Sequence, residues 1–260
     1  MLAIERRNAI LSKLSLEGKV VVGELSREFN VTEETIRRDL EKLEQDGFAR
    51  KTYGGAVKNE NLNIDLPFHV RKQTNIESKR RIAAVIGEMI NDGDYIMLDS
   101  STTALNVIQS IKDRKKLNII TNSITILIEL CNKPDWNVLS TGGVLKEGAL
   151  SLIGYQAKRM ISGYHVDLAI CSCKGLNSDL CINDSNEHDS EIKKAMFASA
   201  TKKILAIDSS KFDKTSFVKV CNLDEVDAVV TDKDPGEEWR KRIATAGVEL
   251  LFYKDDEQSL

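Results

Sequence analysis

Residues 31–43 read V-T-E-E-T-I-R-R-D-L-E-K-L, and the spacing of their apolar residues predicts an amphipathic helix. Ile36, Leu40 and Leu43 fall at i, i+4 and i+7, so they share one helix face and are expected to be buried. Thr32 stands where a helix N-cap belongs, and two glutamates follow it in the first turn, where the helix dipole favours acids. We therefore expect a helix that packs on one side and presents charged side chains on the other.

A shorter helix is predicted just upstream, over residues 22–29, with residues 30–31 as a tight turn between the two. This arrangement is a helix-turn-helix, whose second helix can enter the major groove of DNA. For the two helices alone, an ordinary helical hairpin with solvated charges is the alternative, because Glu34 and Arg38 could form a simple i, i+4 pair.

The segment that follows favours DNA binding. Asp46 and Gly47 end the helix, and residues 48–58, F-A-R-K-T-Y-G-G-A-V-K, are typical of a short two-stranded wing. Arg50, Lys51 and Lys58 are the charged residues of the stretch 50–58, which contains no acid. A basic ribbon beside a recognition helix suits phosphate contacts, which position a protein on DNA. An apolar stretch at 20–22 is expected to pair with this wing.

Residues 6–57 resemble the N-terminal winged helix of the DeoR family of bacterial transcriptional regulators. Two motifs carry the resemblance, E-E-T-I-R-R-D-L at 33–40 and Y-G-G-A at 53–56. The resemblance implies that the helix contacts base edges and backbone, with an arginine suited to guanine, and that the wing contacts phosphates. The residues expected at the DNA are Thr32, Glu34, Thr35, Arg37 and Arg38 from the helix, and Lys51 and Tyr53 from the wing.

Length and charge are compatible with this interpretation. A chain of 260 residues with a formal net charge of −3 is long enough for about two domains. Residues 1–58 contain 11 Lys and Arg against 10 Asp and Glu, so the DNA signal is local, and such modest charge favours binding by two or more copies. A homo-oligomer, a dimer or a tetramer, is therefore expected, with double-stranded DNA as partner.

No apolar run approaches the roughly 20 residues of a membrane span, and the first residues do not resemble a signal peptide. We expect no membrane partner and a cytoplasmic location. The chain has five cysteines, without the spacing of a disulfide framework. Cys171 and Cys173 could belong to a metal or thiol sensor, but a reduced cysteine is more often a small buried hydrophobe. We expect neither a metal site nor a cofactor.

The second half of the chain alternates short apolar runs with helical segments. This pattern predicts an α/β domain with a mostly parallel sheet covered on both faces. Residues 59–76 are polar with one proline, Pro67, and are predicted to be a linker. The expected domains are a winged helix-turn-helix at 1–58 and a sensor domain at 77–260. The expected strands lie at 95–98, 117–120, 136–139, 168–170, 204–207, 228–230 and 248–252.

Five of these predicted strands end in hydroxyl, amide, glycine or lysine residues. In an open α/β sheet, ligands bind beyond the carboxyl ends of the strands. Thr102 and Thr103 begin a predicted helix, whose N–H groups could hold a phosphate. Capping is the alternative for any one of these ends, since the same residues are common wherever a strand turns into a helix. All five together favour a small anionic, hydroxylated ligand.

The resemblance to the family continues here, on L-D-S-S-T-T at 98–103, T-N-S at 121–123, T-G-G at 141–143 and D-S-S-K-F at 208–212. It implies a sensor domain similar in fold to sugar-phosphate isomerases and CoA-transferases, with a phosphorylated sugar or related metabolite as effector. The residues expected at the effector are Asp99, Ser100, Ser101, Thr102, Thr103, Thr121, Asn122, Gly142, Gly143, Lys174, Gly175 and Lys211.

The sequence thus predicts a DNA-binding transcriptional regulator, a repressor of a carbohydrate-metabolism operon, whose DNA affinity responds to a phosphorylated sugar. The alternative is a sugar-phosphate isomerase-like enzyme with an appended DNA-binding module. Proton transfer at a sugar carbon needs a positioned base. No paired-acid motif stands out at the strand ends, so we do not expect an enzyme. The carboxylates available for such chemistry are Asp99, Asp184, Glu187, Asp189 and Asp208.

Overall fold

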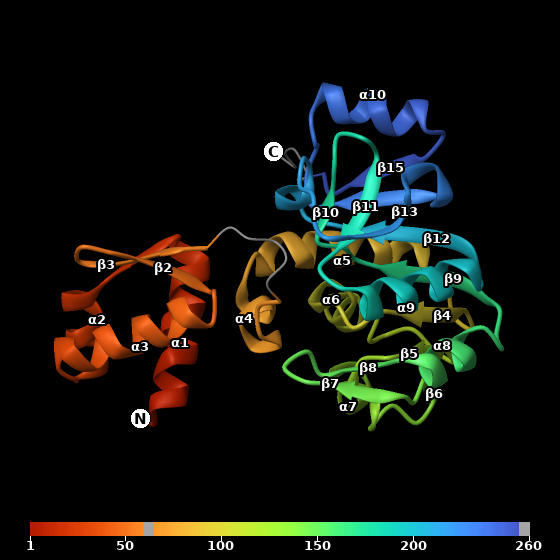
Figure 1. Ribbon diagram of the computed structural model, residues 1–260. Coiled ribbons are helices and arrows are strands. Elements are labelled where there is room, and N and C mark those ends of the chain that lie inside the picture. The colour runs from red at the N-terminus through yellow and green to blue at the C-terminus, as the bar shows by residue number, and fades with distance from the viewer. Residues whose placement is uncertain (60–64, 255–260) are drawn as a thin grey trace, which may run out of the picture. The chain divides into compact units, whose positions relative to one another are not determined.

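The computed structural model describes residues 1–59 and 65–254. The chain divides into two compact units, Met1–Asn75 and Ile76–Leu260, drawn from red to orange and from orange to blue in Figure 1. Each unit is described by itself below. No helix in the described ranges is both long and apolar enough to cross a membrane.

The first unit contains the predicted helix-turn-helix and wing. Its strands form an antiparallel sheet in the order β1-β3-β2, so the predicted pairing of the short upstream strand with the wing is confirmed. The elements are α1 (Ala3–Glu17), β1 (Lys19–Val21), α2 (Val22–Phe29), α3 (Glu33–Gln45), β2 (Ala49–Thr52), β3 (Gly55–Lys58) and α4 (Phe68–Gln73).

The apolar face of α3 packs into the core of this unit. Ile36, Leu40 and Leu43 are 0%, 1% and 4% exposed, which confirms the predicted buried stripe. Asp39 lies on the same stripe and is buried as well, where its carboxylate accepts a hydrogen bond of 2.5 Å from the guanidinium of Arg6 on α1. A buried ion pair therefore ties α1 to the back of α3.

Gly55 of the Y-G-G-A motif permits a close approach between β1 and β3. A Cβ atom on this residue would lie 1.9 Å from the backbone oxygen of Val20. No side chain can occupy that position without separating the two strands. The second glycine of the motif is therefore required by the packing of the wing.

The range 59–76, predicted as a linker, is partly folded. Residues 60–64 lie outside the described part of the chain. Residues 68–73 form α4, whose Val70 is fully buried in the same core as α1 and α3. Phe68 is buried too, and Pro67 precedes the helix, a position that tolerates proline. Burial of these two apolar residues explains why this stretch is a docked helix instead of an extended linker.

The second unit is built on a seven-stranded sheet in the order β15-β14-β12-β9-β4-β5-β6, with every pair of neighbours parallel. Each of the seven predicted apolar runs supplies one of its strands, so the α/β prediction is confirmed. The strands are β4 (Tyr95–Leu98), β5 (Asn118–Thr121), β6 (Asn137–Ser140), β9 (Val166–Cys171), β12 (Ala200–Ala206), β14 (Ala228–Thr231) and β15 (Glu249–Phe252).

Helices cover both faces of this sheet (Figure 1). From β4 the chain adds β5 and β6 on one side of the sheet, and from β9 it adds β12, β14 and β15 on the other side. Right-handed crossovers in these two directions place α6 and α7 on one face and α9 and α10 on the other. Buried side chains of α9 and α10 accordingly share one core with alternate residues of the strands, such as Met97 and Ile120. The helices are α5 (Ile76–Met89), α6 (Thr102–Ser110), α7 (Ile124–Leu130), α8 (Tyr155–Ile161), α9 (Glu187–Ala198) and α10 (Glu237–Thr245).

Smaller elements that the apolar pattern does not predict surround the sheet. A hairpin joins β7 (Val144–Lys146) to β8 (Ser151–Ile153), and a second antiparallel sheet has the order β10-β11-β13. Its strands are β10 (Gly175–Leu176), β11 (Cys181–Asp184) and β13 (Val218–Asn222). These strands belong to the connections that follow β9 and β12, and Gly175, a predicted effector residue, is the first residue of β10.

Candidate DNA-binding and effector sites

The outer face of α3 is a polar surface that begins at a capped N-terminus. The Thr32 hydroxyl accepts a hydrogen bond of 3.2 Å from the Thr35 N–H, as expected for an N-cap. Arg37 and Arg38 are exposed and lie in the first half of the helix. In helix-turn-helix proteins the N-terminal residues of the second helix are those that reach base edges. The geometry therefore supports the predicted recognition surface.

Both arginines are paired with glutamates one turn earlier. Arg37 contacts Glu33 at 2.6 Å and Arg38 contacts Glu34 at 3.3 Å, so the i, i+4 pairing considered as an alternative does form. All four side chains are more than half exposed. Such pairs stabilise a helix by only about 0.3–0.5 kcal/mol, so they cost little to break when a phosphate or a guanine competes.

The wing extends from the end of α3. The Lys51 N–H donates a hydrogen bond of 2.8 Å to the Glu44 carboxylate on α3, which fixes strand β2 of the hairpin to the helix. Tyr53, at the turn of the hairpin, is fully exposed. An exposed aromatic residue and the exposed Arg50 and Lys51 at the edge of a rigid ribbon suit contact with the DNA backbone.

The five predicted effector segments follow five adjacent strands, β6, β5, β4, β9 and β12. Because these strands are parallel, the five segments lie side by side at the carboxyl ends of the strands. Neighbouring strands are about 4.8 Å apart, so the outermost of these ends are separated by about 19 Å, too far for one small metabolite to bridge. The central ends, those of β5, β4 and β9, are the compact part of the site. The change in strand order falls between β4 and β9, where ligands of open α/β sheets bind.

Asp99 organises the turn that follows β4. It is 1% exposed, and its two carboxylate oxygens accept hydrogen bonds of 3.0 Å from the N–H groups of Ser101 and Ser172. Ser101 then caps α6 by accepting a hydrogen bond of 3.0 Å from the Ala104 N–H. These bonds hold the first turn of α6, Thr102 and Thr103, at the edge of the sheet beside the end of β9. A helix N-terminus held in this way favours an anion.

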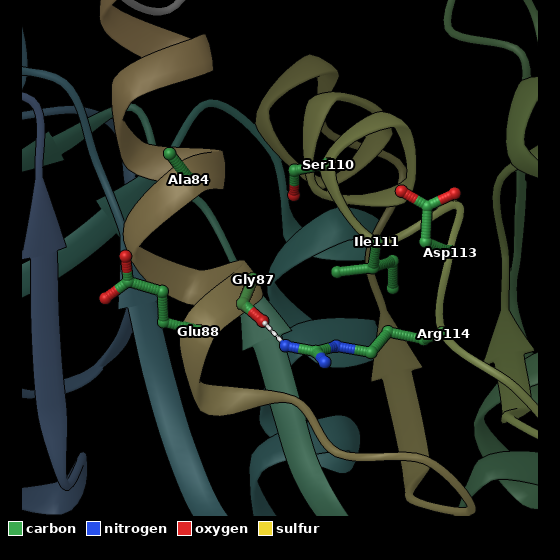
Figure 2. Close-up of a pocket in the computed structure, with 7 residues that line it drawn as sticks. All are labelled: Ala84, Gly87, Glu88, Ser110, Ile111, Asp113 and Arg114. Atoms are coloured by element: carbon green, nitrogen blue, oxygen red, sulfur yellow. Dashed lines mark hydrogen bonds between the residues drawn. The ribbon is translucent and has the colours of Figure 1, made fainter.

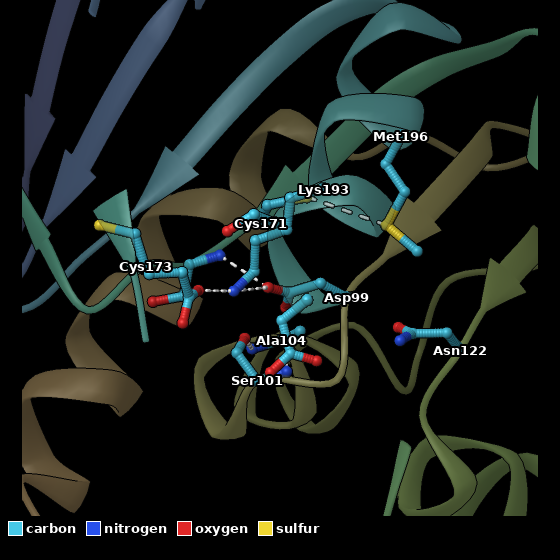
Figure 3. A network of polar contacts seen from close by, with 12 residues as sticks. Asp99, Ser101, Ala104, Asn122, Cys171, Cys173, Lys193 and Met196 are labelled. Atoms are coloured by element: carbon cyan, nitrogen blue, oxygen red, sulfur yellow. Dashed lines mark hydrogen bonds and ion pairs between the residues drawn. The ribbon is translucent and has the colours of Figure 1, made fainter. Parts of the chain in front are cut away.

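Lys193, on α9, is a residue of this region that the sequence did not single out. Its ammonium pairs with the carboxylate of Asp184 and lies 3.8 Å from that of Asp99. Figure 3 shows Lys193 beside Asp99; both carboxylates are buried, and the lysine side chain is 12% exposed. Lys146, on the β7–β8 hairpin, contacts Asp189 on α9 at 2.6 Å. An ionic cluster formed by these five residues therefore lies beside the α6 turn.

The titration of the cluster follows from its burial and charges. Burial acts to lower the pKa of Lys193, but the carboxylates of Asp184, Asp99 and Asp189 outweigh it and raise that pKa above its ordinary value. Burial raises the pKa of Asp99, and the Lys193 ammonium partly offsets this effect. Burial acts to raise the pKa of Asp189, but the positive charges of Lys193 and Lys146 outweigh this effect and lower that pKa below its ordinary value. Lys193 is thus a permanent positive charge at neutral pH.

Thr121 and Asn122 end β5, next to Asp99, because Leu98 is the register partner of Thr121. The Thr121 hydroxyl donates a hydrogen bond of 2.7 Å to the Leu98 backbone oxygen, so it joins the two strands. Asn122 donates from Nδ2 to the Leu152 backbone oxygen at 3.0 Å. Both residues are buried.

The remaining predicted effector residues are farther from this centre or have packing roles of their own. Gly142 and Gly143 follow β6 with φ of +61° and +112°, values that favour glycine. Gly175 lies in β10, and a Cβ atom there would be 2.3 Å from the Lys214 backbone oxygen. Lys211 follows β12, at the opposite end of the row of strand ends from the two glycines.

The cysteines at the end of β9 are packing residues in this geometry. Cys171 and Cys173 are 1% and 6% exposed, and the Cys173 thiol donates to the Gly175 backbone oxygen at 3.3 Å. Burial raises the pKa of both thiols, that of Cys173 to about 12. Metal binding and redox chemistry need the thiolate, which these environments disfavour. Within residues 1–59 and 65–254, no group of three or more metal-ligating side chains is assembled.

A separate pocket lies between α5 and the C-terminal end of α6 (Figure 2). The Arg114 guanidinium crosses it and donates a hydrogen bond of 3.2 Å to the Gly87 backbone oxygen. Ser110, which lines this pocket, is eight residues from Thr102, or about 12 Å along the helix axis. The pocket is therefore distinct from the strand-end site. Its lining residues are Ala84, Gly87, Glu88, Ser110, Ile111, Asp113 and Arg114.

Comparison with known proteins identifies both halves of the chain. Residues 6–61 match the DeoR-like helix-turn-helix domain, and residues 74–233 match the DeoR C-terminal sensor domain. The chain belongs to the DeoR family. It is a DNA-binding transcriptional regulator with a sensor domain, as predicted, and the alternative of an isomerase-like enzyme is wrong.

Relatives in the DeoR family align along most of the chain. It is 40% identical over 232 residues to YulB of Bacillus subtilis (strain 168), an uncharacterized HTH-type transcriptional regulator, covering 89% of this chain and 90% of that protein. It is 31% identical over 231 residues to the glycerol-3-phosphate regulon repressor of Escherichia coli (strain K12), covering 89% and 91%. Among solved structures, ribose 5-phosphate isomerase A of Methanocaldococcus jannaschii matches with a TM-score of 0.40 and 16% identity, covering 54% of this chain and 55% of that chain.

Proposed function

We propose that this regulator is a repressor of a carbohydrate-metabolism operon, and that a phosphorylated sugar bound at the ends of β5, β4 and β9 changes its affinity for DNA. The proposal rests on the Asp99–Ser101 turn, which presents the N-terminus of α6 at the change in strand order. That arrangement favours an anionic group. The similarity to a glycerol-3-phosphate regulon repressor supports a small phosphate ester as effector.

The effector acts on DNA binding only through a difference in its affinity for two states of the protein. A homo-oligomer, with two helix-turn-helix units on one operator, provides such states, because the spacing of the two units must match the two half-sites. We therefore place residues 1–58 at the DNA and residues 77–260 at the effector and the oligomer interface.

The test of the DNA-binding half is Arg38→Ala. This side chain is 76% exposed and contacts only Glu34 among the ion pairs of the described residues, so its loss should leave the fold intact. Loss of one good base contact costs about 1–3 kcal/mol, which corresponds to roughly 5- to 150-fold weaker binding. The measurement is fluorescence anisotropy with DNA from upstream of the protein's own gene, in the absence of effector.

Arg80→Ala is the matched control, because it removes an exposed arginine paired with Glu77 from the other unit. It should bind the same DNA as tightly as the parent protein. Affinity for sugar phosphates, measured by calorimetry, should be unchanged in both variants. Unchanged operator affinity in Arg38→Ala would show that α3 does not read the DNA through this residue.

The test of the sensor half is Thr102→Ala. Thr102 is the first residue of α6 and is 4% exposed. Loss of one hydrogen bond from its hydroxyl to a charged phosphate should weaken effector binding by roughly 10- to 150-fold, without changing DNA affinity in the absence of effector. Calorimetry with a panel of sugar phosphates measures this change.

Thr245→Ala serves as the comparison, since it removes a threonine hydroxyl at the C-terminal end of α10, at the opposite edge of the sheet. Equal effector affinity in Thr102→Ala and Thr245→Ala would remove the first turn of α6 from the site.

A further inference from the structure

Asn122 carries a buried hydrogen-bond acceptor that is left without a donor. The residue is 1% exposed, and its Nδ2 donates to the Leu152 backbone oxygen at 3.0 Å. A backbone oxygen can only accept a hydrogen bond, so the amide atom that contacts it must be the donor, Nδ2. The other terminal atom of the amide is therefore Oδ1. No donor among the described residues lies within hydrogen-bond distance of Oδ1.

The unpartnered oxygen lies at the centre of the effector site. Asn122 and Asp99 are the first residues after two adjacent parallel strands in register, and both continue the alternation of Met97 and Ile120, which face α9. In Figure 3 the Asn122 amide points toward the turn that runs from Asp99 to Ala104. The acceptor therefore faces the same region as the first turn of α6.

A buried acceptor with no donor costs about 1–3 kcal/mol, so a partner supplied by a ligand would recover that free energy. A phosphate ester is a poor partner, because at neutral pH it is mostly a dianion whose oxygens are all acceptors. A cationic donor is disfavoured by the neighbouring ammonium of Lys193, which already lies between Asp99 and Asp184. A hydroxyl group satisfies both conditions.

Asp99 does not take this role in place of Asn122. Both of its carboxylate oxygens already accept backbone N–H groups, and one of them faces Lys193. The site is therefore divided into a donor side, the N-terminus of α6, and an acceptor side, Oδ1 of Asn122.

We propose that Asn122 accepts a hydrogen bond from a hydroxyl of the effector, so that the sensor selects a phosphate ester that also carries a free hydroxyl over a phosphate that lacks one. This inference rests on the proposed function, in which the phosphate binds at α6, and it adds the residue that recognises the rest of the molecule. Asn122 is then a specificity-determining residue of the sensor.

The experiment measures, for the parent protein and for each variant, how much more tightly hydroxylated phosphate esters bind than a phosphate ester without a free hydroxyl. Calorimetry on the full chain compares hydroxylated esters (glycerol 3-phosphate and a set of hexose and pentose phosphates) with ethyl phosphate and inorganic phosphate. The parent protein should bind its best hydroxylated ester at least tenfold more tightly than ethyl phosphate. In Asn122→Ala this preference should fall by about tenfold, while the affinity for ethyl phosphate stays the same.

Two further variants separate recognition from a structural role. Asn122→Asp keeps an acceptor at the position of Oδ1 but loses the donor to Leu152, so it should keep the preference that Asn122→Ala loses. A purely structural role through Leu152 would remove the preference in both variants and would overturn the proposal. Asn118→Ala, at the other end of β5, is the matched control and should behave as the parent protein.

The other outcomes also decide. If the parent protein binds ethyl phosphate as tightly as every hydroxylated ester, the role of Asn122 is wrong although the phosphate site stands. If the preference is the same in Asn122→Ala as in the parent, water or protein satisfies Oδ1 and the proposal fails. If no phosphate compound binds the parent protein, the proposed function fails and this inference with it.

Discussion

Replacing Asp39 with alanine is expected to destabilise the N-terminal unit by about 3–5 kcal/mol, because it leaves the Arg6 guanidinium buried without its counter-charge. The Asp39 side chain is 4% exposed and the Arg6 side chain 9% exposed, and they are 2.5 Å apart. Arg7 adds a longer contact of 3.7 Å to the same carboxylate. The pair fixes α3 against α1, so its loss should also weaken DNA binding.

Differential scanning calorimetry of the full chain measures this effect, since two compact units can unfold in separate transitions. The transition of the N-terminal unit should move to lower temperature while the other stays in place. Glu41→Ala, which removes an exposed acid from the same helix, is the control and should change little. An Asp39→Ala variant as stable as Glu41→Ala would show that the buried pair contributes nothing net. The variant also contrasts with Arg38→Ala, which should lose DNA affinity without losing stability.

Replacing Lys193 with methionine is expected to destabilise the second unit by about 3–5 kcal/mol, because two carboxylates then remain buried without a cation between them. Asp99 and Asp184 are 2% and 3% exposed, and Lys193 is 12% exposed, so solvent cannot compensate for the lost charge. Methionine is close to lysine in length, so packing is largely preserved. Effector binding should weaken as well, since Asp99 holds the α6 turn.

The loss in Lys193→Met should depend on pH. Without the ammonium, only the hydrogen bonds from Ser101 and Ser172 oppose the effect of burial, so the pKa of Asp99 should lie further above its value in the unfolded chain. When the pKa of an acid is higher in the folded protein than in the unfolded chain, the protein loses stability as the pH rises from the lower pKa through the higher one. It regains that stability as the pH falls. The deficit relative to the parent protein should therefore be largest near about pH 8 and smaller near about pH 5.

Chemical denaturation at both pH values provides the measurement. Lys194→Met is the matched control, because Lys194 is the next residue of α9, is 42% exposed and pairs only with Glu191 among the ion pairs of the described residues. Its stability should follow that of the parent protein at both pH values. A deficit in Lys193→Met that does not change with pH would mean that Asp99 does not take up a proton when the ammonium is absent.

Much of the fold could be predicted from local pattern. Ile36, Leu40 and Leu43 are buried where their spacing places them, and each of the seven apolar runs became a strand of one parallel sheet. Residues 68–73 differ from the prediction, because a six-residue helix carries too short a pattern to reveal that Val70 packs against α1. In Asp39 the sequence did hold a signal, an acid on the buried stripe of α3, which requires a partner elsewhere in the chain.

The candidate effector site was predicted only in outline. The strand ends could be recognised by composition, since hydroxyls, amides and glycines follow five apolar runs. The role of Lys193 in the site could not be recognised from the sequence, because this residue lies in the middle of a predicted helix next to another lysine. The separate roles of Asp99 and Asn122 could not be predicted either, since both are polar residues at strand ends and differ only in which of their atoms are already bonded.

The sequence by itself determined the class of this protein and the type of fold of its two parts, and it predicted a recognition helix and the strand ends proposed here as the effector site. These properties depend on periodicity and on motifs confined to short stretches of chain, which local spacing records. Only the tertiary structure decided which polar groups are satisfied. The Arg6–Asp39 pair and the position of Lys193 between Asp99 and Asp184 join segments distant in sequence. Whether Oδ1 of Asn122 has a donor likewise depends on which distant segments surround it. Hydrogen bonding and burial depend on the distances in space between residues far apart in the sequence, and the order of residues alone does not give those distances.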